Sequence, residues 1–235
     1  MTDFADKEID DLINNLDNEY FASVPSANGR QVQKGKDLAK LLVVWQAERT
    51  CPDILRYETE LLDNVLDLLR QQVEVIEIAH TTDEINDKEK FEMLLIETEL
   101  ERVKFIIRGY IRARIHKIDL HMMHILHSEG TIEKLSQTEQ QYVRRREVQL
   151  RRFYGVRFLD SLPQKLQRLD DTAGMIPMIE RPDLDAVVFV RILRDVESTI
   201  DVGDEDELEL KSGNIYVLPY RFIRHQVTLG HAQLV

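Results

Sequence analysis

Residues 96–125, IETELERVKFIIRGYIRARIHKIDLHMMHI, contain the most regular apolar pattern of the chain. Their apolar side chains recur in steps of three and four, which places them on one stripe of an α-helix. The pattern predicts a long helix that starts near Asp87 and runs at most to Ser128, before Gly130, and it leaves open a break of this helix near the histidines at 121–127. The stripe consists of Ile96, Leu100, Val103, Ile107, Ile111, Ile115, Ile118, Met122 and Ile125.

Two more helices are expected before this one. DLAKLLVVWQAER, residues 37–49, has helical periodicity and stops before Pro52. The stop is expected because a residue that precedes proline is disfavoured in the helical region of backbone space. A second helix is predicted over about 53–79, where leucine, valine and isoleucine again recur at helical spacing.

A fourth helix is expected after the long one. Ser136 and Glu139 have the spacing of a capping box, in which each residue satisfies a backbone N–H at the start of a helix. The helix is predicted to end at Gly155. The four helices together predict a bundle, and residues 37–169 are assigned to one helical domain.

The sequence changes character after this domain. The string DDTAGMIPMIERPD, which begins at Asp170, has no useful period and contains a glycine and two prolines, so residues 170–181 are predicted to be a linker. AVVFVRIL, residues 186–193, is a β-branched run typical of a buried strand. Weaker strand signals follow at 196–202 and 207–218, with turns predicted around Gly203 and around Ser212 and Gly213.

The end of the chain completes a small β-rich module over residues 182–235. Tyr220, Ile223 and Val227 have helical spacing, Gly230 is placed to cap that helix, and HAQLV forms the last strand. The fold class predicted for the whole chain is therefore α+β: mainly a helical bundle, followed by a small C-terminal β-rich module.

The N-terminal residues form two short segments. Residues 1–20 contain an acidic, amphipathic pattern, with Ile9, Leu12, Ile13 and Leu16 on one stripe. Residues 21–36 are polar and rich in Gly, Pro, Ser and Asn, so we expect a flexible linker there.

Composition and charge narrow the function classes. The 235 residues are 43% hydrophobic and contain a single cysteine, so no intrachain disulfide can form and a cytosolic or nuclear protein is expected. No apolar run approaches the length of a membrane span. The net charge of −12 argues against a protein that binds nucleic acid with its whole surface.

The positive charge is concentrated in one part of the chain. Between Glu101 and Arg157 there are 13 Lys and Arg residues against 6 Asp and Glu residues. This region is predicted to be either an ordinary solvated helix face or a docking surface for acidic helices or DNA phosphates. The candidate basic docking surface comprises Lys104, Arg108, Arg112, Arg144, Arg145 and Arg151.

Four histidines near the end of the long helix are candidates for a metal site. His116, His121, His124 and His127 lie close together in the sequence. On a helix, however, the last three progress around the axis by about 60° from one to the next, so they do not converge on one ion. We therefore expect no bound metal.

The remaining motifs do not indicate catalysis. GRQVQKGKD, residues 29–37, differs from a phosphate-binding loop in its glycine spacing, in its Asp37 and in the lack of a preceding strand. No nucleophile elbow or metalloprotease motif occurs. We expect a protein that is not an enzyme and needs no cofactor.

Several strings, in the right order, resemble landmarks of the GINS family. ELERVKFIIRGYIRARIHKID resembles the long third helix of that family, LSQTEQQYVRRRE the start of its fourth, and GHAQLV the end of its β module. The Pro-Asp-Leu-Asp string at 182–185, with the complete C-terminus, favours the Sld-five branch. The other landmarks that match are Trp45, Glu48, Arg49, Pro52, Leu55, Tyr57, Pro182, Leu184, Asp185, Val188 and Phe189.

This resemblance implies a role in DNA replication. GINS is a nuclear heterotetramer that joins the minichromosome-maintenance ATPase ring and a further helicase cofactor to form the eukaryotic replicative helicase. The resemblance therefore implies a non-catalytic scaffold subunit that binds three other GINS subunits. It leaves open whether the chain contacts DNA directly.

The N-terminal segment resembles a different motif. IDDLINNL is similar to the short helix by which fungal replisome proteins bind a trimeric adaptor hub. The matching residues are predicted to bind that hub, although an ordinary packed or frayed helix remains the alternative. They are Ile9, Asp10, Asp11, Leu12, Ile13 and Leu16.

Two function classes thus remain at this stage. The first is a scaffold subunit of the replicative helicase, needed for the initiation and elongation of replication. The second is a stand-alone helical protein that binds nucleic acid through the basic region of residues 101–157.

Overall fold

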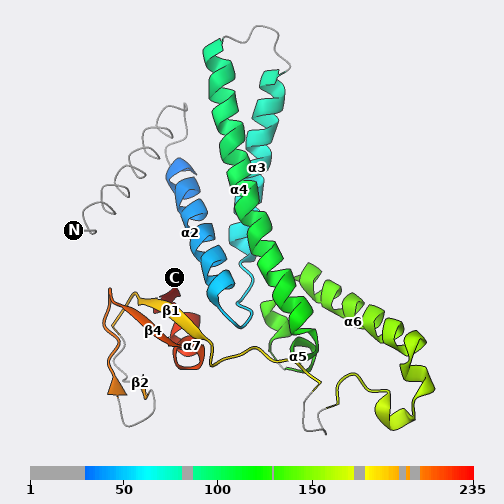
Figure 1. Ribbon diagram of the computed structural model, residues 1–235. Helices are drawn as coiled ribbons and strands as arrows, with labels where there is room; N and C mark the ends of the chain where they lie inside the picture. The colour runs from blue at the N-terminus through cyan, green and yellow to red at the C-terminus, as the bar shows by residue number, and fades with distance from the viewer. Residues whose placement is uncertain (1–29, 81–86, 129, 172–177, 196–199, 202–206) are drawn as a thin grey trace. The chain divides into compact units, whose positions relative to one another are not determined.

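The computed structural model describes residues 30–80, 87–128, 130–171, 178–195, 200–201 and 207–235 (Figure 1). It is mainly helical and has a small antiparallel sheet near the C-terminus, which confirms the predicted α+β class. Within these ranges, no helix is long and apolar enough to cross a membrane. The helices are α2 (Arg30–Thr50), α3 (Thr59–His80), α4 (Asp87–Leu120), α5 (Met122–His127), α6 (Gln137–Arg157) and α7 (Tyr220–Thr228).

By compactness the chain divides into two units. The first comprises residues up to 42 together with 60–100, and the second comprises 43–59 together with 101–235. The boundary between the units falls within α2 and within α4. The second unit therefore contains the C-terminal β module, α5, α6 and the C-terminal parts of α2 and α4.

The first unit contains α3 and the first half of α4, which run antiparallel to each other (Figure 1). Leu62, Val65 and Ile76 of α3 are buried, as their helical spacing predicts. Several large apolar side chains of the same two helices are nevertheless exposed: Val75, Ile78, Phe91 and Leu94.

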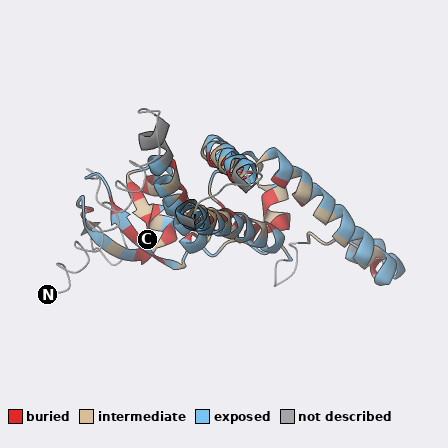
Figure 2. Ribbon diagram, turned by 90° about the horizontal axis from the view of Figure 1, so that it is seen from above, coloured by how far each residue is buried: buried red, intermediate tan, exposed pale blue. Residues whose placement is uncertain are grey.

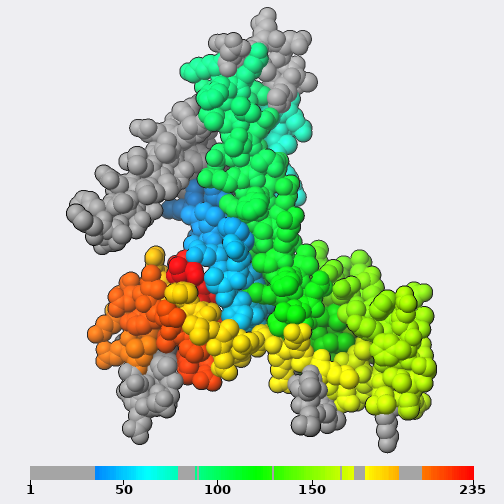
Figure 3. Space-filling view, in the orientation of Figure 1, coloured from blue at the N-terminus to red at the C-terminus, as the bar shows by residue number. Residues whose placement is uncertain are grey.

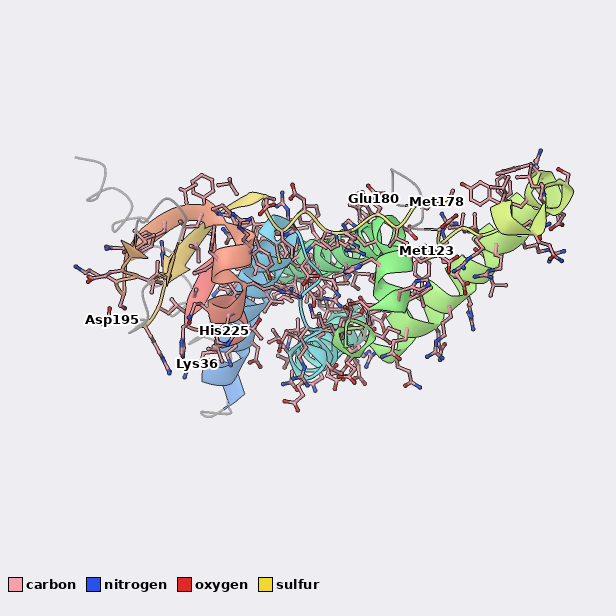
Figure 4. All side chains as sticks on the ribbon, turned by 90° about the horizontal axis from the view of Figure 1, so that it is seen from below. Lys36, Met123, Met178, Glu180, Asp195 and His225 are labelled. Carbon is pink, nitrogen blue, oxygen red and sulfur yellow. The ribbon has the colours of Figure 1, made fainter. Side chains whose placement is uncertain are left out.

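The second unit contains two separate hydrophobic cores. One core is formed by α5 with its neighbours, where Ile54, Ile118, Met122, Ile125, Leu135 and Val143 are buried, and Met123 (labelled in Figure 4) packs against them. The other is the core of the β module, and Cys51 contributes to it. In the short segment between α2 and α3, Cys51 therefore packs in the core of the β module and Ile54 packs in the core around α5.

The sheet of the β module has the order β4-β1-β5, and both pairings are antiparallel. Its inner face, which carries Val188, Val190 and Ile192 of β1, packs with Tyr220 and Ile223 of α7. The strands are β1 (Val187–Ile192), β4 (Ile215–Pro219) and β5 (Ala232–Leu234), and a separate two-stranded pair is formed by β2 (Ile200–Asp201) and β3 (Glu207–Leu208).

The sequence placed most elements correctly but shifted some boundaries. The strand signal at 207–218 corresponds to β3, a connection and β4, and the predicted turn around Ser212 and Gly213 is present, with Gly213 at a positive φ of 86° before β4. The capping box is present: Ser136 Oγ accepts from the backbone N–H of Glu139, and the Glu139 carboxylate accepts from the backbone N–H of Ser136. The helix that it starts, α6, continues to Arg157, two residues beyond Gly155.

One part of the predicted flexible linker at 21–36 is wrong. Residues 30–36 form the first turns of α2, so the helix begins before Asp37. The stretch is polar, but glutamine, lysine and arginine are good helix formers, and adding residues to an existing helix is easier than nucleating one. Among residues 30–36, Gly35 is the residue with a low helix propensity.

The second predicted helix begins six residues late, at Thr59 and not at 53. The carbonyls of Asp53, Ile54 and Leu55 accept hydrogen bonds from the side chains of Lys117, Lys134 and Arg114. A helix over these residues would engage the same carbonyls in its own ladder. Side chains that are distant in the sequence therefore hold this segment extended.

Candidate interaction surfaces and the ion network that positions them

Arg114 of α4 lies at the centre of a buried ion network. Its side chain is fully buried, with Nε and Nη2 donating to the two carboxylate oxygens of Glu139 at 2.8 and 3.0 Å. Nη1 donates to Glu48 Oε2 at 3.0 Å and to the carbonyl of Leu55 at 2.8 Å, and Nη2 donates to the carbonyl of Lys134 at 3.2 Å. One guanidinium thus joins α2, the 51–58 segment, α4 and α6.

Glu48 of α2 uses both of its oxygens in the same network. Its side chain is 1% exposed, and Lys117 Nζ donates to Oε1 at 2.7 Å while Arg114 occupies Oε2. Lys117 also donates to the carbonyl of Asp53 at 2.9 Å. A buried carboxylate that lost one of these partners would be strongly destabilising, because its charge would be left without water or a counterion.

Asp53 connects the network to the β module. Its Oδ2 accepts from Lys134 Nζ at 2.9 Å and from Arg224 Nη2 of α7 at 3.0 Å, and its side chain is 6% exposed. Its Oδ1 accepts from the backbone N–H of Ile54 at 2.8 Å. We call the set Glu48, Asp53, Arg114, Lys117, Lys134, Glu139 and Arg224 the Arg114 network.

The surroundings of Arg114 keep it charged. Burial alone would lower its pKa, but the hydrogen bonds to Glu139 and the charge of Glu48 outweigh burial and raise the pKa of this guanidinium. The guanidinium also stacks on two aromatic rings, 5.2 Å from the centroid of Tyr57 and 5.6 Å from that of Tyr110. Burial raises the pKa of Tyr110, so this phenol stays neutral.

Sequence analysis missed this network. A signal was available, because Arg114 lies one turn before Ile118 on the apolar stripe of the long helix, where a charge requires a buried partner. Glu48 appeared only as a family landmark and Glu139 only as a capping residue. Neither gave a reason to pair them, since they are 66 and 25 residues away from Arg114.

The histidines surround the break between α4 and α5. His121 is buried at the break, His124 is partly buried, and His127 is exposed, with Nε2 3.3 Å from Asp170 Oδ2. Burial lowers the pKa of His124. Among the residues that the structure describes, no group of three or more His, Cys, Asp and Glu side chains could hold a metal ion. The absence of metal stays a prediction.

Three residues of the candidate basic docking surface, Lys104, Arg108 and Arg112, follow one another at i, i+4 spacing on α4, and we call them the α4 ladder. An acidic residue of the same helix partly neutralises their charge. Lys104 Nζ lies 2.7 Å from Glu101 Oε1, and Arg108 Nη1 lies 3.8 Å from Glu101 Oε2. Lys104 holds the pKa of Glu101 below its usual range. Arg112 is exposed. Two of the three predicted docking cations on α4, Lys104 and Arg108, therefore share the carboxylate of Glu101.

The arginines of the basic cluster on α6 lie on one side of the helix. Arg144, Arg145 and Arg151 are all exposed, and most of the surface of α6 is exposed (Figure 2). At 100° per residue, Arg144 and Arg151 lie about 20° apart, and Arg145 and Arg152 lie about 80° to 100° from Arg144. The four side chains therefore lie within an arc of about 120°, and Arg151 pairs with Glu147 at 2.6 Å.

Two further surfaces are apolar and exposed. On the outer face of the sheet, Phe189 pairs in register with Val217, and their side chains are 57% and 53% exposed. Val187 and Ile215 extend this face. At the end of α6, Phe153, Val156 and Phe158 are exposed. Contiguous apolar surface of this kind is typical of protein–protein contact.

The predicted hub-binding residues lie outside the described part of the chain. They are Ile9, Asp10, Asp11, Leu12, Ile13 and Leu16, within residues 1–29. Their role stays a prediction.

Comparison with known proteins identifies similar chains. Residues 60–156 match the family model "GINS complex protein helical bundle domain", and residues 182–235 match "DNA replication complex GINS protein SLD5 C-terminus". The chain is 36% identical to DNA replication complex GINS protein SLD5 of Chaetomium globosum, over 97% of this chain and 100% of the relative. It is 34% identical to the proteins of that name from Yarrowia lipolytica, over 95% of this chain and 83% of the relative, and from Schizosaccharomyces pombe, over 85% and 92%.

Proposed function

Because the chain belongs to the SLD5 family of DNA replication complex GINS proteins, we propose that it is a subunit of a GINS complex and acts in DNA replication. The observation that carries this proposal is the 36% identity that extends over nearly the whole chain. The chain acts as a non-catalytic scaffold in the nucleus and assembles with three other GINS subunits. The assembly in turn binds the minichromosome-maintenance ATPase ring and its further helicase cofactor.

The internal structure of the second unit supports a scaffold role. A scaffold has to hold its binding surfaces in a fixed relation, and here the segment between α2 and α3 joins two cores, with Asp53 bound to Arg224 of the β module. The exposed apolar face of the sheet is a surface that another subunit would cover.

No observation favours the alternative of a stand-alone nucleic-acid-binding protein. Lys104 and Arg108 of α4 share Glu101, and Arg151 of α6 pairs with Glu147. A protein that follows a phosphate backbone instead keeps such cations available for phosphates.

We further propose that the N-terminal segment recruits a second partner. Ile9, Asp10, Asp11, Leu12, Ile13 and Leu16 combine apolar residues on one stripe with neighbouring carboxylates. This combination suits a helix that binds an apolar groove bordered by lysine or arginine on the adaptor hub.

Co-expression tests the proposed function. Produced with the three partner GINS chains of the same organism, the chain should elute in one complex with 1:1:1:1 stoichiometry, as measured by size-exclusion chromatography with light scattering. Produced alone, it should be poorly soluble because its apolar faces are exposed. A soluble monomer that ignores the three partners would contradict the proposal.

A further inference from the structure

The C-terminal half of α6 has a face that combines arginines with exposed apolar side chains. It comprises Arg145, Arg152, Phe153, Val156 and Arg157, and we call it the α6 arginine face. At 100° per residue these five side chains lie within an arc of about 140°. All five are exposed, with Phe153 at 54% and Val156 at 77%. The helix α6 is the yellow-green part of Figure 3.

The carboxylates of α6 itself are engaged elsewhere. Glu139 is buried and bound to Arg114, and Glu147 pairs with Arg151. Asp119 of α4 lies 3.4 Å from Arg146 and accepts from the Tyr142 hydroxyl, and the carboxylate of the exposed Asp160 lies beside Gly155. The three arginines of the face therefore give it a net positive charge, although the whole chain has a net charge of −12.

The aromatic side chains at this end are arranged in a row. The Arg157 guanidinium lies 5.4 Å from the centroid of the Phe153 ring. Phe153 meets Tyr154 edge-on at 5.4 Å, and Tyr154 meets Phe158 edge-on at 5.9 Å. A guanidinium stacked on a ring keeps its in-plane N–H donors free to bind a carboxylate in a bidentate fashion.

We propose that the α6 arginine face binds an acidic amphipathic helix of a partner protein. Apolar side chains of that helix cover Phe153 and Val156, and its carboxylates bind Arg145 and Arg152. These two arginines are seven residues apart, about 10.5 Å along the axis, which matches two carboxylates spaced i, i+7 with apolar residues between them. The proposal rests on the proposed function in that the chain works through protein partners.

The same features disfavour a nucleic acid as the occupant. A base stacks on a free ring face, but one face of Phe153 is already covered by Arg157. Val156, the most exposed large apolar side chain described, contributes nothing to phosphate binding but is a natural anchor for a protein partner.

Photocross-linking identifies the occupant. p-Benzoylphenylalanine is placed at Phe153 in the assembled four-chain complex, alone and in nuclear extract from dividing cells, and at Phe91 as a control. Phe91 is also an exposed phenylalanine, at 60%, but lies near the start of α4 and not on α6. The position-153 probe should label one segment, identified by mass spectrometry, that carries carboxylates spaced i, i+7. A basic or neutral segment, equal labelling of the same segment from position 91, or no labelling overturns the proposal.

Charge reversal then tests the contact directly. The cross-linked segment is made as a fluorescent peptide and titrated against the complex carrying R145E/R152E or the matched control R144E/R151E. The first variant should bind at least tenfold more weakly and the second less than threefold, while both assemble and melt like the parent. Equal losses, or tighter binding of a 20-nucleotide single strand that only R145E/R152E abolishes, would refute the proposal. If the parent chain failed to assemble with the three partners, the proposed function would be refuted instead. The affinity of the peptide would in that case be measured on the full chain alone, so the two failures can be distinguished.

Discussion

Arg114 and Arg152 are the same type of residue in opposite environments, one buried and one exposed. Arg114 is fully buried, stacks on two aromatic rings and meets two carboxylates and two carbonyls. Arg152 is exposed on a face of α6 where no carboxylate of that helix is available to it. Burial removes water from the first guanidinium and makes every partner indispensable, whereas the second keeps its water until a partner replaces it. The first holds the fold together and the second is available for binding.

The largest effect should follow from breaking the Arg114 network. Arg114→Ala leaves Glu48 and Glu139 buried without their main counterion, which should lower the free energy of unfolding by about 3–5 kcal/mol. Arg152→Ala is the matched control and should change it by less than about 0.5 kcal/mol. Denaturant unfolding of both variants measures the difference. If Arg114→Ala cost no more than Arg152→Ala, the network would not hold this unit together.

Substitutions in a binding segment should weaken binding without loss of stability. Ile13→Ala with Leu16→Ala removes two apolar anchors, each worth about 1.5–3 kcal/mol when fully buried, so affinity for the adaptor hub should fall at least about tenfold. Assembly with the other GINS subunits should not change. Titration of the purified hub against both complexes measures this. Normal hub binding with failed assembly would instead make the segment a structural helix.

A close contact beside the network predicts a smaller effect. A Cβ on Gly109 would lie 2.9 Å from Trp45 Nε1, so Gly109→Ala should cost about 1–3 kcal/mol from overpacking, offset by about 1 kcal/mol of helix propensity. Gly35→Ala is the control, because nothing lies within 4 Å of its added Cβ and only the propensity gain applies. Thermal melting should therefore move in opposite directions for the two variants. A shift in the same direction would show that Trp45 does not pack on Gly109.

The smallest effect concerns the reactivity of Cys51 in the core of the β module. Burial raises the pKa of its thiol to about 11, so roughly one molecule in a thousand carries the thiolate at pH 8. The folded chain should react slowly with a thiol reagent such as Ellman's reagent, and about tenfold faster for each pH unit up to pH 10. The unfolded chain, whose thiol ionises near 9.0, should react at once. Fast stoichiometric reaction of the folded chain at pH 7 would mean that this core is open.

The raised pKa of Cys51 also determines how the stability of the folded chain changes with pH. Because the folded thiol ionises at higher pH than the unfolded one, the unfolded chain releases its proton first as the pH rises. The contribution of Cys51 to stability is therefore complete below pH 9 and declines between about pH 9 and 11.

The elements with local signals could be predicted from the sequence alone. The apolar stripe of residues 96–125 predicted α4, the Ser136–Glu139 spacing predicted the cap of α6, and the β-branched run at 186–193 predicted β1. Each of these signals lies within one element, so it does not depend on the rest of the chain.

The burial of particular charges and the start of the second helix could not be predicted from the sequence, because both depend on contacts between distant residues. Arg114 finds Glu48 and Glu139 across 66 and 25 residues, and the carbonyls of Asp53, Ile54 and Leu55 are held by side chains from α4 and from the residues just before α6. No local pattern encodes such a pairing, because the free energy of a buried charge depends on the water that it loses and on the partners that the fold brings to it.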